Sequence, residues 1–261
     1  MSDKNMIEII NLSKEFNGHQ VLNRLNLTIK KGYTQVVIGR SGGGKSVLLK
    51  HIVGLLRADS GQIIVDGQDI TMLDEKQLDR LRLKMALLFQ GAALFDSLSV
   101  GENVGFILRE HTDLDELSIR KRVRDSLELV GLKGVEELMP AELSGGMKKR
   151  VGFARAICAR PDIILYDEPT TGIDPIMADA INTLIRSLHD KLAVTSICVT
   201  HDIVSAYKIA DRISMLYDGR IIESGTPEEI KNSKDPYVQQ FITGAAHGPI
   251  TDNGVNHSYK A

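Results

Sequence analysis

Short apolar segments recur along the chain, and several are hydrophobic at consecutive positions rather than at alternating ones. The predicted strands are residues 7–10, 35–38, 63–65, 86–89, 163–166 and 196–199. Consecutive apolar positions are typical of strands that helices cover on both faces. A helical spacing of apolar residues follows Pro175, at Ile181, Leu184, Ile185 and Leu188. The mixture predicts an α/β fold with a largely parallel sheet.

A different pattern interrupts this alternation. Residues 71–84 and 109–130 are rich in leucine and alternating charge, and they contain no strand pattern. One helical stripe there consists of Ile119, Val123, Leu127 and Val130. We therefore predict a mainly helical lobe over roughly residues 90–158, inserted into the α/β core.

The end of the chain changes character twice. Asp218-Gly219 separates two apolar runs, 213–217 and 220–224, which predicts a two-residue β-hairpin. From Gly244 onward there is no periodicity. We expect one domain over residues 1–243, followed by a tail, 244–261, that is flexible or ordered by a partner.

Composition limits the functional classes. The 261 residues fit one large domain, and 32 basic against 34 acidic residues give a formal charge of −2, which disfavours a nucleic-acid-binding surface. The two cysteines, Cys158 and Cys198, predict buried thiols in a reducing compartment. No apolar run approaches the ~20 residues of a spanning helix, and the first ten residues do not resemble a signal peptide.

The first motif with a chemical meaning follows the predicted strand 35–38 and matches GxxxxGK[ST]. It consists of Gly39, Arg40, Ser41, Gly42, Gly43, Gly44, Lys45 and Ser46. Glycines let backbone N–H groups approach phosphate oxygens, and a helix N-terminus favours negative charge. Lys45 would reach the β- and γ-phosphates, and the Ser46 hydroxyl would bind Mg²⁺. A glycine-rich turn before an ordinary helix is the simpler alternative, but strand, loop and helix all occur in the required order.

Two adjacent carboxylates end the predicted strand 163–166. Asp167 and Glu168 point to opposite faces if the strand continues, so they can take separate roles at the carboxyl edge of the sheet. Asp167 suits Mg²⁺ through a coordinated water, and Glu168 suits a base that polarises the attacking water. A solvated strand end would explain two acids equally well if the Gly39–Ser46 loop were absent.

A second phosphate-binding helix end is predicted at Ser144, Gly145 and Gly146. Ser144 is a suitable N-cap, and the two glycine amides add an anion-binding end to a helix of basic and small residues. Two such ends in one chain suggest a head-to-tail dimer, with each nucleotide between two subunits.

The order of these motifs resembles that of the ATP-binding cassette (ABC) transporter ATPases across roughly residues 6–228. The corresponding segments are Gly39–Ser46 as Walker A, Gln90 as the Q-loop, Leu143–Met147 as the signature, Asp167-Glu168 as Walker B with the catalytic Glu, Gly172–Asp174 as the D-loop and Thr200–Asp202 as the H-loop. The resemblance implies a P-loop NTPase ABC ATPase fold, with a RecA-like core, an antiparallel β subdomain and an inserted α-helical lobe. ATP and Mg²⁺ are the implied cofactors.

The resemblance also implies roles for residues that would attract no attention alone. Phe16 would stack on adenine, Gln90 would touch Mg²⁺ or water and signal to a membrane partner, and His201 would contact the γ-phosphate. Asp174 would lie at the nucleotide interface. Taken singly, Phe16 reads as a core residue, Gln90 as a polar loop residue and His201 as a structural histidine.

Some segments outside the catalytic motifs resemble one branch of the family, the Mla-type phospholipid-trafficking ATPases of double-membraned bacteria. These segments are Leu88–Leu98, Leu108–Thr112, Met139–Arg150 and Gly244–Ile250, with Met147 where many solute importers have Gln. The resemblance implies two ATPase copies, a permease, an MCE-domain lipid-binding protein and a small STAS-domain partner, at the cytoplasmic face of the inner membrane. The alternatives are an ATPase for an amino-acid or metal importer, a non-transport ABC protein of DNA repair or ribosomes, and an ATP-dependent scaffold.

Overall fold

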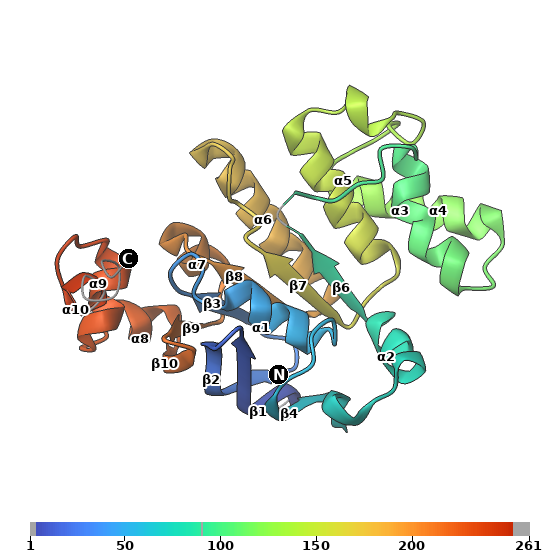
Figure 1. The fold of residues 1–261 in the computed structure, drawn as a ribbon. Helices are drawn as coiled ribbons and strands as arrows, with labels where there is room; N and C mark the ends of the chain where they lie inside the picture. Colours follow the sequence, from blue (N-terminus) through green and yellow to red (C-terminus); the bar gives the residue numbers. More distant parts are fainter. Residues whose placement is uncertain (1–3, 90, 253–261) are drawn as a thin grey trace.

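The structure, a computed structural model, describes residues 4–89 and 91–252 (Figure 1). Its strands are β1 (Asn5–Phe16), β2 (His19–Lys30), β3 (Thr34–Ile38), β4 (Ser60–Val65), β5 (Gln68–Asp69), β6 (Met85–Leu88), β7 (Ile163–Asp167), β8 (Thr195–Thr200), β9 (Arg212–Tyr217) and β10 (Arg220–Gly225). Its helices are α1 (Lys45–Ile52), α2 (Glu75–Arg82), α3 (Val100–His111), α4 (Glu116–Leu129), α5 (Gly145–Cys158), α6 (Pro175–Leu192), α7 (Ile203–Ile209), α8 (Pro227–Lys231), α9 (Pro236–Thr243) and α10 (Pro249–Asp252), with 3₁₀ segments η1 (Ile70–Met72) and η2 (Pro140–Glu142).

A six-stranded sheet forms the centre of the molecule, in the order β10-β9-β3-β8-β7-β6. All neighbouring strands are parallel except β10, which runs antiparallel to β9. The largely parallel sheet predicted from the sequence is therefore confirmed. Because β3, β6, β7 and β8 are parallel, their carboxyl ends meet at one edge, where the predicted motifs follow.

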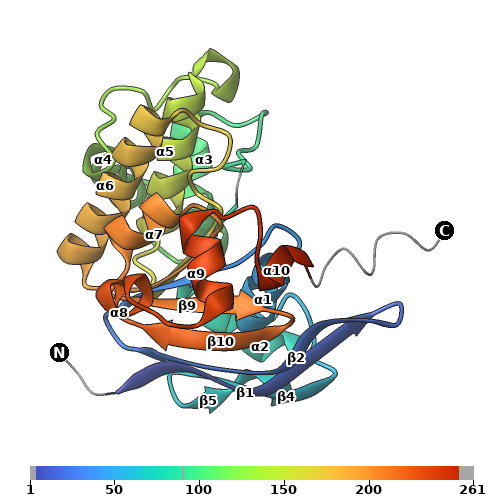
Figure 2. The same cartoon turned by 90° about the vertical axis from the view of Figure 1, so that its left-hand side faces the viewer.

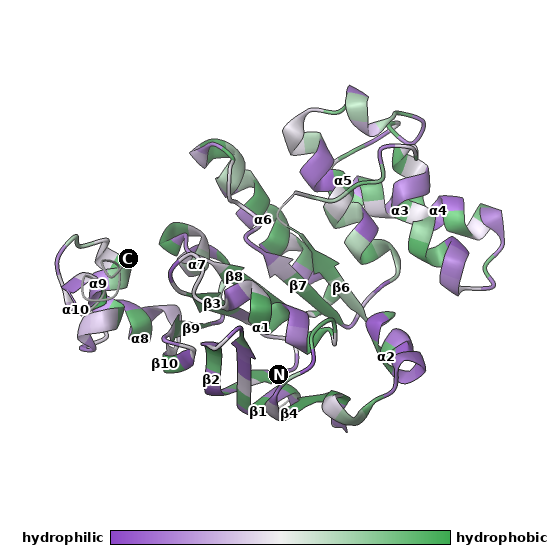
Figure 3. Ribbon diagram, in the orientation of Figure 1, coloured by the Kyte–Doolittle hydropathy of each residue, from purple (hydrophilic) through white to green (hydrophobic). Residues whose placement is uncertain are grey.

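Alternate residues of the central strands supply two separate hydrophobic clusters. Val36 and Ile38 of β3 belong to the cluster that α3, α4, α5, α6 and α7 complete, whereas Val37 belongs to the cluster with α1 and β1. This explains the consecutive apolar positions. We expected helices on both faces, but one face is covered by α1 together with a second sheet (Figure 2). The strands β6, β7 and β8 are accordingly mostly hydrophobic, while α2 is largely hydrophilic (Figure 3).

The second sheet is antiparallel and has the order β2-β1-β4-β5. Its long hairpin, β1–β2, turns at Asn17 and Gly18, which both have positive φ. The antiparallel β subdomain is thus confirmed. The sequence predicted only residues 7–10 of β1, because bulges shift the register along the hairpin and disturb its alternation.

A helical lobe of α3, α4 and α5 stands to one side of the sheets (Figure 1). A capping box between Ser99 and Glu102 starts α3, and Asp115 caps α4. The predicted stripe is buried, from Ile119 at 3% exposed to Leu127 at 0%. The inserted helical lobe is confirmed, and the chain leaves it through α5 to enter β7.

Over residues 244–252, the first part of the predicted tail, the chain makes hydrogen bonds with α9. The side chain of Gln240 donates to the Ala245 carbonyl at 3.1 Å and to Thr251 Oγ1 at 3.0 Å, and it accepts from the Ile250 N–H at 2.7 Å. Ile250 of α10 is buried at 5% exposed. One buried amide side chain therefore folds this segment back onto α9, and residues 253–261 lie outside the described part.

The structure also bears on the predicted hairpin, the two cysteines and the length of the helices. Asp218 and Gly219 both have positive φ, and β9 and β10 form the predicted two-residue hairpin. Cys158 and Cys198 are free and buried, as expected. Across residues 4–89 and 91–252, each helix is too short or too polar to reach from one side of a bilayer to the other.

Candidate nucleotide-binding site

The loop between β3 and α1 depends on two of its glycines. A Cβ on Gly39 would lie 2.5 Å from the Leu216 carbonyl oxygen. Gly44 has φ +94°, and a Cβ there would come within 3.1 Å of Val21. Gly44 is also the N-cap of α1 and provides no side-chain acceptor, so the first N–H groups of the helix remain available to an anion.

Lys45 is held under this loop by the loop's own backbone. Its side chain is 5% exposed, and Nζ donates to the carbonyls of Gly39 at 2.8 Å and Arg40 at 3.0 Å. Nζ also lies 3.3 Å from Glu168 Oε1. Contacts within the chain therefore hold the ammonium group beside the cavity.

Ser46 and Asp167 form the second link between the loop and the strands. The Ser46 hydroxyl donates to Asp167 Oδ1 at 2.8 Å. Both groups offer the oxygen ligands that Mg²⁺ prefers, and Mg²⁺ is commonly held by one carboxylate together with substrate phosphates. Within residues 4–89 and 91–252, no group of three or more His, Cys, Asp or Glu forms a larger metal cluster. The donor set fits Mg²⁺ bound with a nucleotide.

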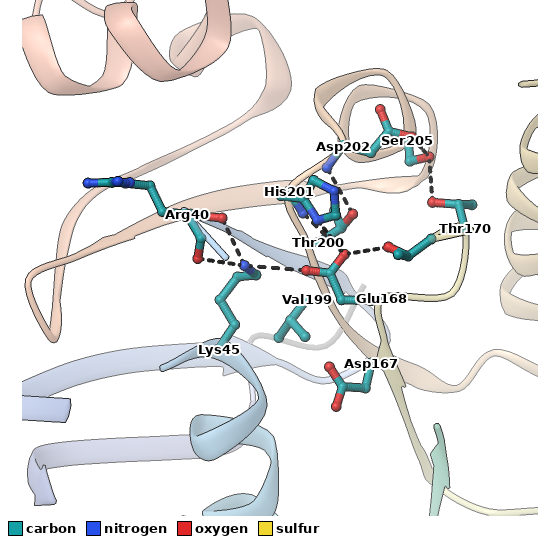
Figure 4. A network of polar contacts seen from close by, with 12 residues as sticks. Arg40, Lys45, Asp167, Glu168, Thr170, Val199, Thr200, His201, Asp202 and Ser205 are labelled. Atoms are coloured by element: carbon teal, nitrogen blue, oxygen red, sulfur yellow. Dashed lines mark hydrogen bonds and ion pairs between the residues drawn. The ribbon is translucent and has the colours of Figure 1, made fainter. Parts of the chain in front are cut away.

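Glu168 follows β7 in a left-handed conformation, with φ +49°, and its carboxylate is at the centre of a polar network (Figure 4). Oε2 lies 2.8 Å from His201 Nδ1 and accepts from Thr171 Oγ1 at 3.0 Å. Burial by itself would raise the pKa of Glu168, but the His201 hydrogen bond and the Lys45 charge outweigh burial and hold this pKa below its ordinary value. The carboxylate is therefore ionised at neutral pH.

A cavity of about 390 Å³ joins these elements at the carboxyl edge of the sheet. Its lining residues are Val21, Ser41, Gly42, Gly44, Lys45, Ser46, Val47, Glu168, Thr171 and His201. Gly39, Arg40, Gly43 and Asp167 lie next to this lining in sequence. The predicted phosphate loop, the Walker B glutamate and the H-loop histidine are thus brought together in one chain.

Other predicted residues lie away from that cavity. Phe16 is 40% exposed near the tip of the β1–β2 hairpin, with the Lys14 ammonium 5.2 Å from its ring centroid. Ser144 caps α5 by accepting from the Met147 N–H, and Asp174 caps α6 by accepting from two N–H groups. Gln90 lies outside the described residues.

The N-terminus of α5, in the signature segment, lies next to the N-terminus of α6, which follows the D-loop segment. A Cβ on Gly146 would lie 2.5 Å from Met177 Cε of α6. Ser144, Gly145 and Asp174 are exposed. The chain therefore presents a second potential anion-binding surface that does not contribute to its own phosphate cavity.

Three lining residues, Val21, Val47 and Thr171, were not predicted from the sequence, and Val47 directly follows the predicted loop in α1. Val21 enters from β2, and Thr171 reaches Glu168 because the Thr171 N–H donates to the Glu168 carbonyl at 3.2 Å and closes a turn. The spacing of three residues between Glu168 and a hydroxyl was an available signal for Thr171. Val21 had none, because only the tertiary fold places β2 beside Gly44.

A larger groove, of about 810 Å³, lies in the helical lobe between α3, α4 and residues 133–137. Arginine and glutamate side chains, including Arg109 and Glu116, line it together. It contains none of the predicted nucleotide-binding residues. The site is therefore identified by its chemistry rather than by cavity size.

Comparison with known proteins agrees with this geometry. The family model described as "ABC transporter" matches residues 22–171. The intermembrane phospholipid transport system ATP-binding protein MlaF of Haemophilus influenzae is 44% identical, over 95% of this chain and 94% of its own. The probable ribonucleotide transport ATP-binding protein mkl of Mycobacterium bovis is 42% identical, over 94% of this chain and 68% of its own.

Solved structures give the same result. The cbiO1 protein from Clostridium perfringens, part of the ABC transporter complex cbiONQ, has a TM-score of 0.82 at 31% identity, over 89% of this chain and 93% of its own. The ATP-binding cassette MJ0796, in a dimeric post-hydrolysis state bound to ADP and Pi, has a TM-score of 0.77 at 31% identity, over 85% of this chain and 99% of its own. The chain belongs to the ABC transporter family and is one of its ATP-hydrolysing, nucleotide-binding proteins.

Proposed function

We propose that this chain is the ATPase subunit of a transporter that moves phospholipid between the membranes of a double-membraned bacterium. One observation supports phospholipid as the cargo. The similarity to MlaF, at 44% identity, extends over 94% of that protein's length and so reaches beyond the shared catalytic motifs. The contact of Glu168 with both Lys45 and His201 supports hydrolysis as the chemical step.

Hydrolysis here depends on positioning and on charge, with no covalent intermediate on the protein. Lys45 and the amides of residues 42–46 bind the β- and γ-phosphates. Ser46 and Asp167, together with Gln90, which lies outside the described residues, would hold Mg²⁺, and the ion would supply positive charge that offsets the charge of the phosphates. Phe16 stacks on adenine.

Glu168 and His201 act on the attacking water and the terminal phosphate. The ionised Glu168 carboxylate orients the water and accepts its proton. His201 Nδ1 keeps that carboxylate in place, and the ring contacts the γ-phosphate. Because Lys45 Nζ lies 3.3 Å from Glu168 Oε1, phosphates bound at Lys45 would compete with the carboxylate for the lysine and leave the carboxylate to the water.

The exposed signature surface implies a second copy of the chain. Ser144, Gly145, Gly146 and Asp174 meet the nucleotide of the partner in a head-to-tail dimer, as the dimeric relative MJ0796 supports. ATP closes the dimer, and hydrolysis reopens it. The assembly further contains integral-membrane permease subunits, an MCE-domain lipid-binding protein and a small STAS-domain protein. The ATPase lies peripherally at the cytoplasmic face of the inner membrane.

Replacing the proposed base tests the chemical step. Glu168→Gln keeps the side-chain volume and removes the charge, so we expect turnover to fall by about 100-fold or more while ATP binding persists. Phosphate release from the purified transporter complex measures turnover. Undiminished steady-state hydrolysis would exclude Glu168 as the base.

The relative named for ribonucleotide transport makes a solute importer the second candidate. Affinity purification from native membranes, followed by protein and lipid mass spectrometry, separates the two. An MCE-domain protein with bound phospholipid supports lipid cargo. A periplasmic solute-binding protein in its place would overturn the cargo and leave the ATPase assignment intact.

A further inference from the structure

Helix α5 reaches the hydrolytic region through a side chain in its second turn. Lys149 Nζ donates to the Pro169 carbonyl at 2.8 Å and to the Thr171 carbonyl at 3.3 Å. These carbonyls belong to the loop directly after Glu168. The contact joins the helical lobe to the central sheet, and it starts from the helix that Ser144 caps.

The same loop continues to the Glu168 carboxylate through Thr171. The Thr171 N–H donates to the Glu168 carbonyl at 3.2 Å, and Thr171 Oγ1 donates to Glu168 Oε2 at 3.0 Å. The loop also contacts α7, where Thr170 Oγ1 lies 3.3 Å from the buried Ser205 Oγ. Lys149 of α5 and Ser205 of α7 therefore both contact this loop.

The burial of Lys149 and the backbone conformation of Glu168 indicate that the Lys149 contact constrains the loop after Glu168. Burial lowers the pKa of Lys149, so its ammonium has lost water, which the two carbonyls replace. Glu168 has φ +49°, a conformation that non-glycine residues adopt only when their surroundings enforce it. A loop released from Lys149 would relax this residue and misplace its carboxylate.

We propose that Lys149 is a positioning residue for Glu168, acting through residues 169–171. The inference rests on the proposed role of Glu168 in hydrolysis. Because α5 begins at the surface that would meet the partner's nucleotide, any shift of this helix is transmitted to the base of its own subunit. The signature helix then contributes to both nucleotide sites of a dimer.

Lys149→Met and Lys149→Arg, in the purified transporter complex, test the proposal. The methionine variant loses the donor at nearly constant length, and we expect kcat to fall about tenfold with the KM for ATP within about twofold, because positioning and not binding is impaired. Arginine can donate to both carbonyls and restores most of kcat. Lys121→Met, at an exposed position of α4, is the matched control and stays at wild-type values.

Amide hydrogen exchange of the nucleotide-free subunit supplies a readout without catalysis. We expect faster exchange at residues 168–172 in Lys149→Met, and wild-type exchange there in Lys149→Arg. Unchanged kcat and exchange in Lys149→Met would overturn the inference, as would equal loss of kcat in both Lys149 variants. Full turnover in Glu168→Gln is a separate result, which would reject the proposed base itself.

Discussion

The two phosphate-binding helix ends of this chain are built differently. At α1, Lys45 is buried and contacts its own loop and Glu168, and Ser46 contacts Asp167. At α5, Ser144 is exposed, and its hydroxyl accepts from the Met147 N–H as a local helix cap. We call the α1 end the prepared end, because its contacts form within the subunit. We call the α5 end the exposed end, because its ligand would come from a second subunit.

This difference separates two functions that the same local chemistry could serve. Both ends have glycines at a helix N-terminus, before α1 and in the first turn of α5, and both have a favourable helix field. Among the described residues, the carboxylates and the histidine to which we assign hydrolysis lie at the α1 end. We infer that α1 binds and cleaves the subunit's own ATP, while α5 senses the ATP of a second copy.

The largest expected effect comes from removing the cation of the prepared end. Lys45→Met deletes the charge that faces the phosphates, and we expect hydrolysis to fall by about 1000-fold, with weaker ATP binding to the single subunit. Phosphate release and equilibrium dialysis measure the two quantities. Lys50→Met, at an exposed position of the same helix, is the control. If Lys45→Met hydrolysed ATP at the rate of this control, the α1 end would not be the hydrolytic end.

A second test asks whether both regions belong to one folding unit. Phe153 of α5 is fully buried, and its ring centroid lies 5.7 Å from that of Tyr166 in β7. Phe153→Ala should lower the free energy of unfolding by about 3–5 kcal/mol in urea titrations. Leu117→Ala, at a position 81% exposed, should cost little. Equal losses for the two variants would mean that α5 is not anchored to the sheet.

The exposed end is probed by Ser144→Ala, with Ser99→Ala as its control. Each loses an N-cap hydroxyl in the helical lobe and should lose about 1 kcal/mol of stability. Only Ser144→Ala should reduce hydrolysis, by about tenfold, while ATP binding to the single subunit stays unchanged. Weaker binding in the isolated Ser144→Ala subunit would place α5 in the same cavity as α1.

The smallest effect concerns pH. His51 of α1 is 1% exposed, and burial, helped by the charge of Lys14, lowers its pKa below the ordinary 6.5. The unfolded chain therefore takes up a proton first, so this residue reduces stability as pH falls below about 6.5. His51→Gln should flatten the fall in Tm between about pH 7 and 5.5, and the exposed-site variant His19→Gln should not. Parallel Tm curves for His51→Gln and wild type would refute this.

Local patterns in the sequence were sufficient for much of the fold and the prepared site. Consecutive apolar residues located the central strands, and the Asp218-Gly219 turn located the β9–β10 hairpin. The Gly39–Ser46 loop and the Asp167-Glu168 pair were found because each is continuous in the chain. Contacts between distant segments left no such pattern.

The contacts that could not be predicted from the sequence depend on how the chain folds back on itself. In the sequence, Lys149 resembles the other basic residues of its helix. Its carbonyl partners follow from the packing of α5 beside the loop after Glu168. Gln240 reads as a surface residue, yet it supports the turn that carries Ile250. The family resemblance implied the second sheet, but the apolar runs alone did not show that it covers one face of the core, because such runs do not reveal what packs on them.

If the prepared end of one chain meets the exposed end of a second copy, ATP should bring two chains together. Light scattering of purified Glu168→Gln with ATP and Mg²⁺ measures this association. We expect a mass of two chains with ATP, one chain without it, and one chain when Ser144→Ala is added. A single-chain mass with nucleotide fully bound would contradict it.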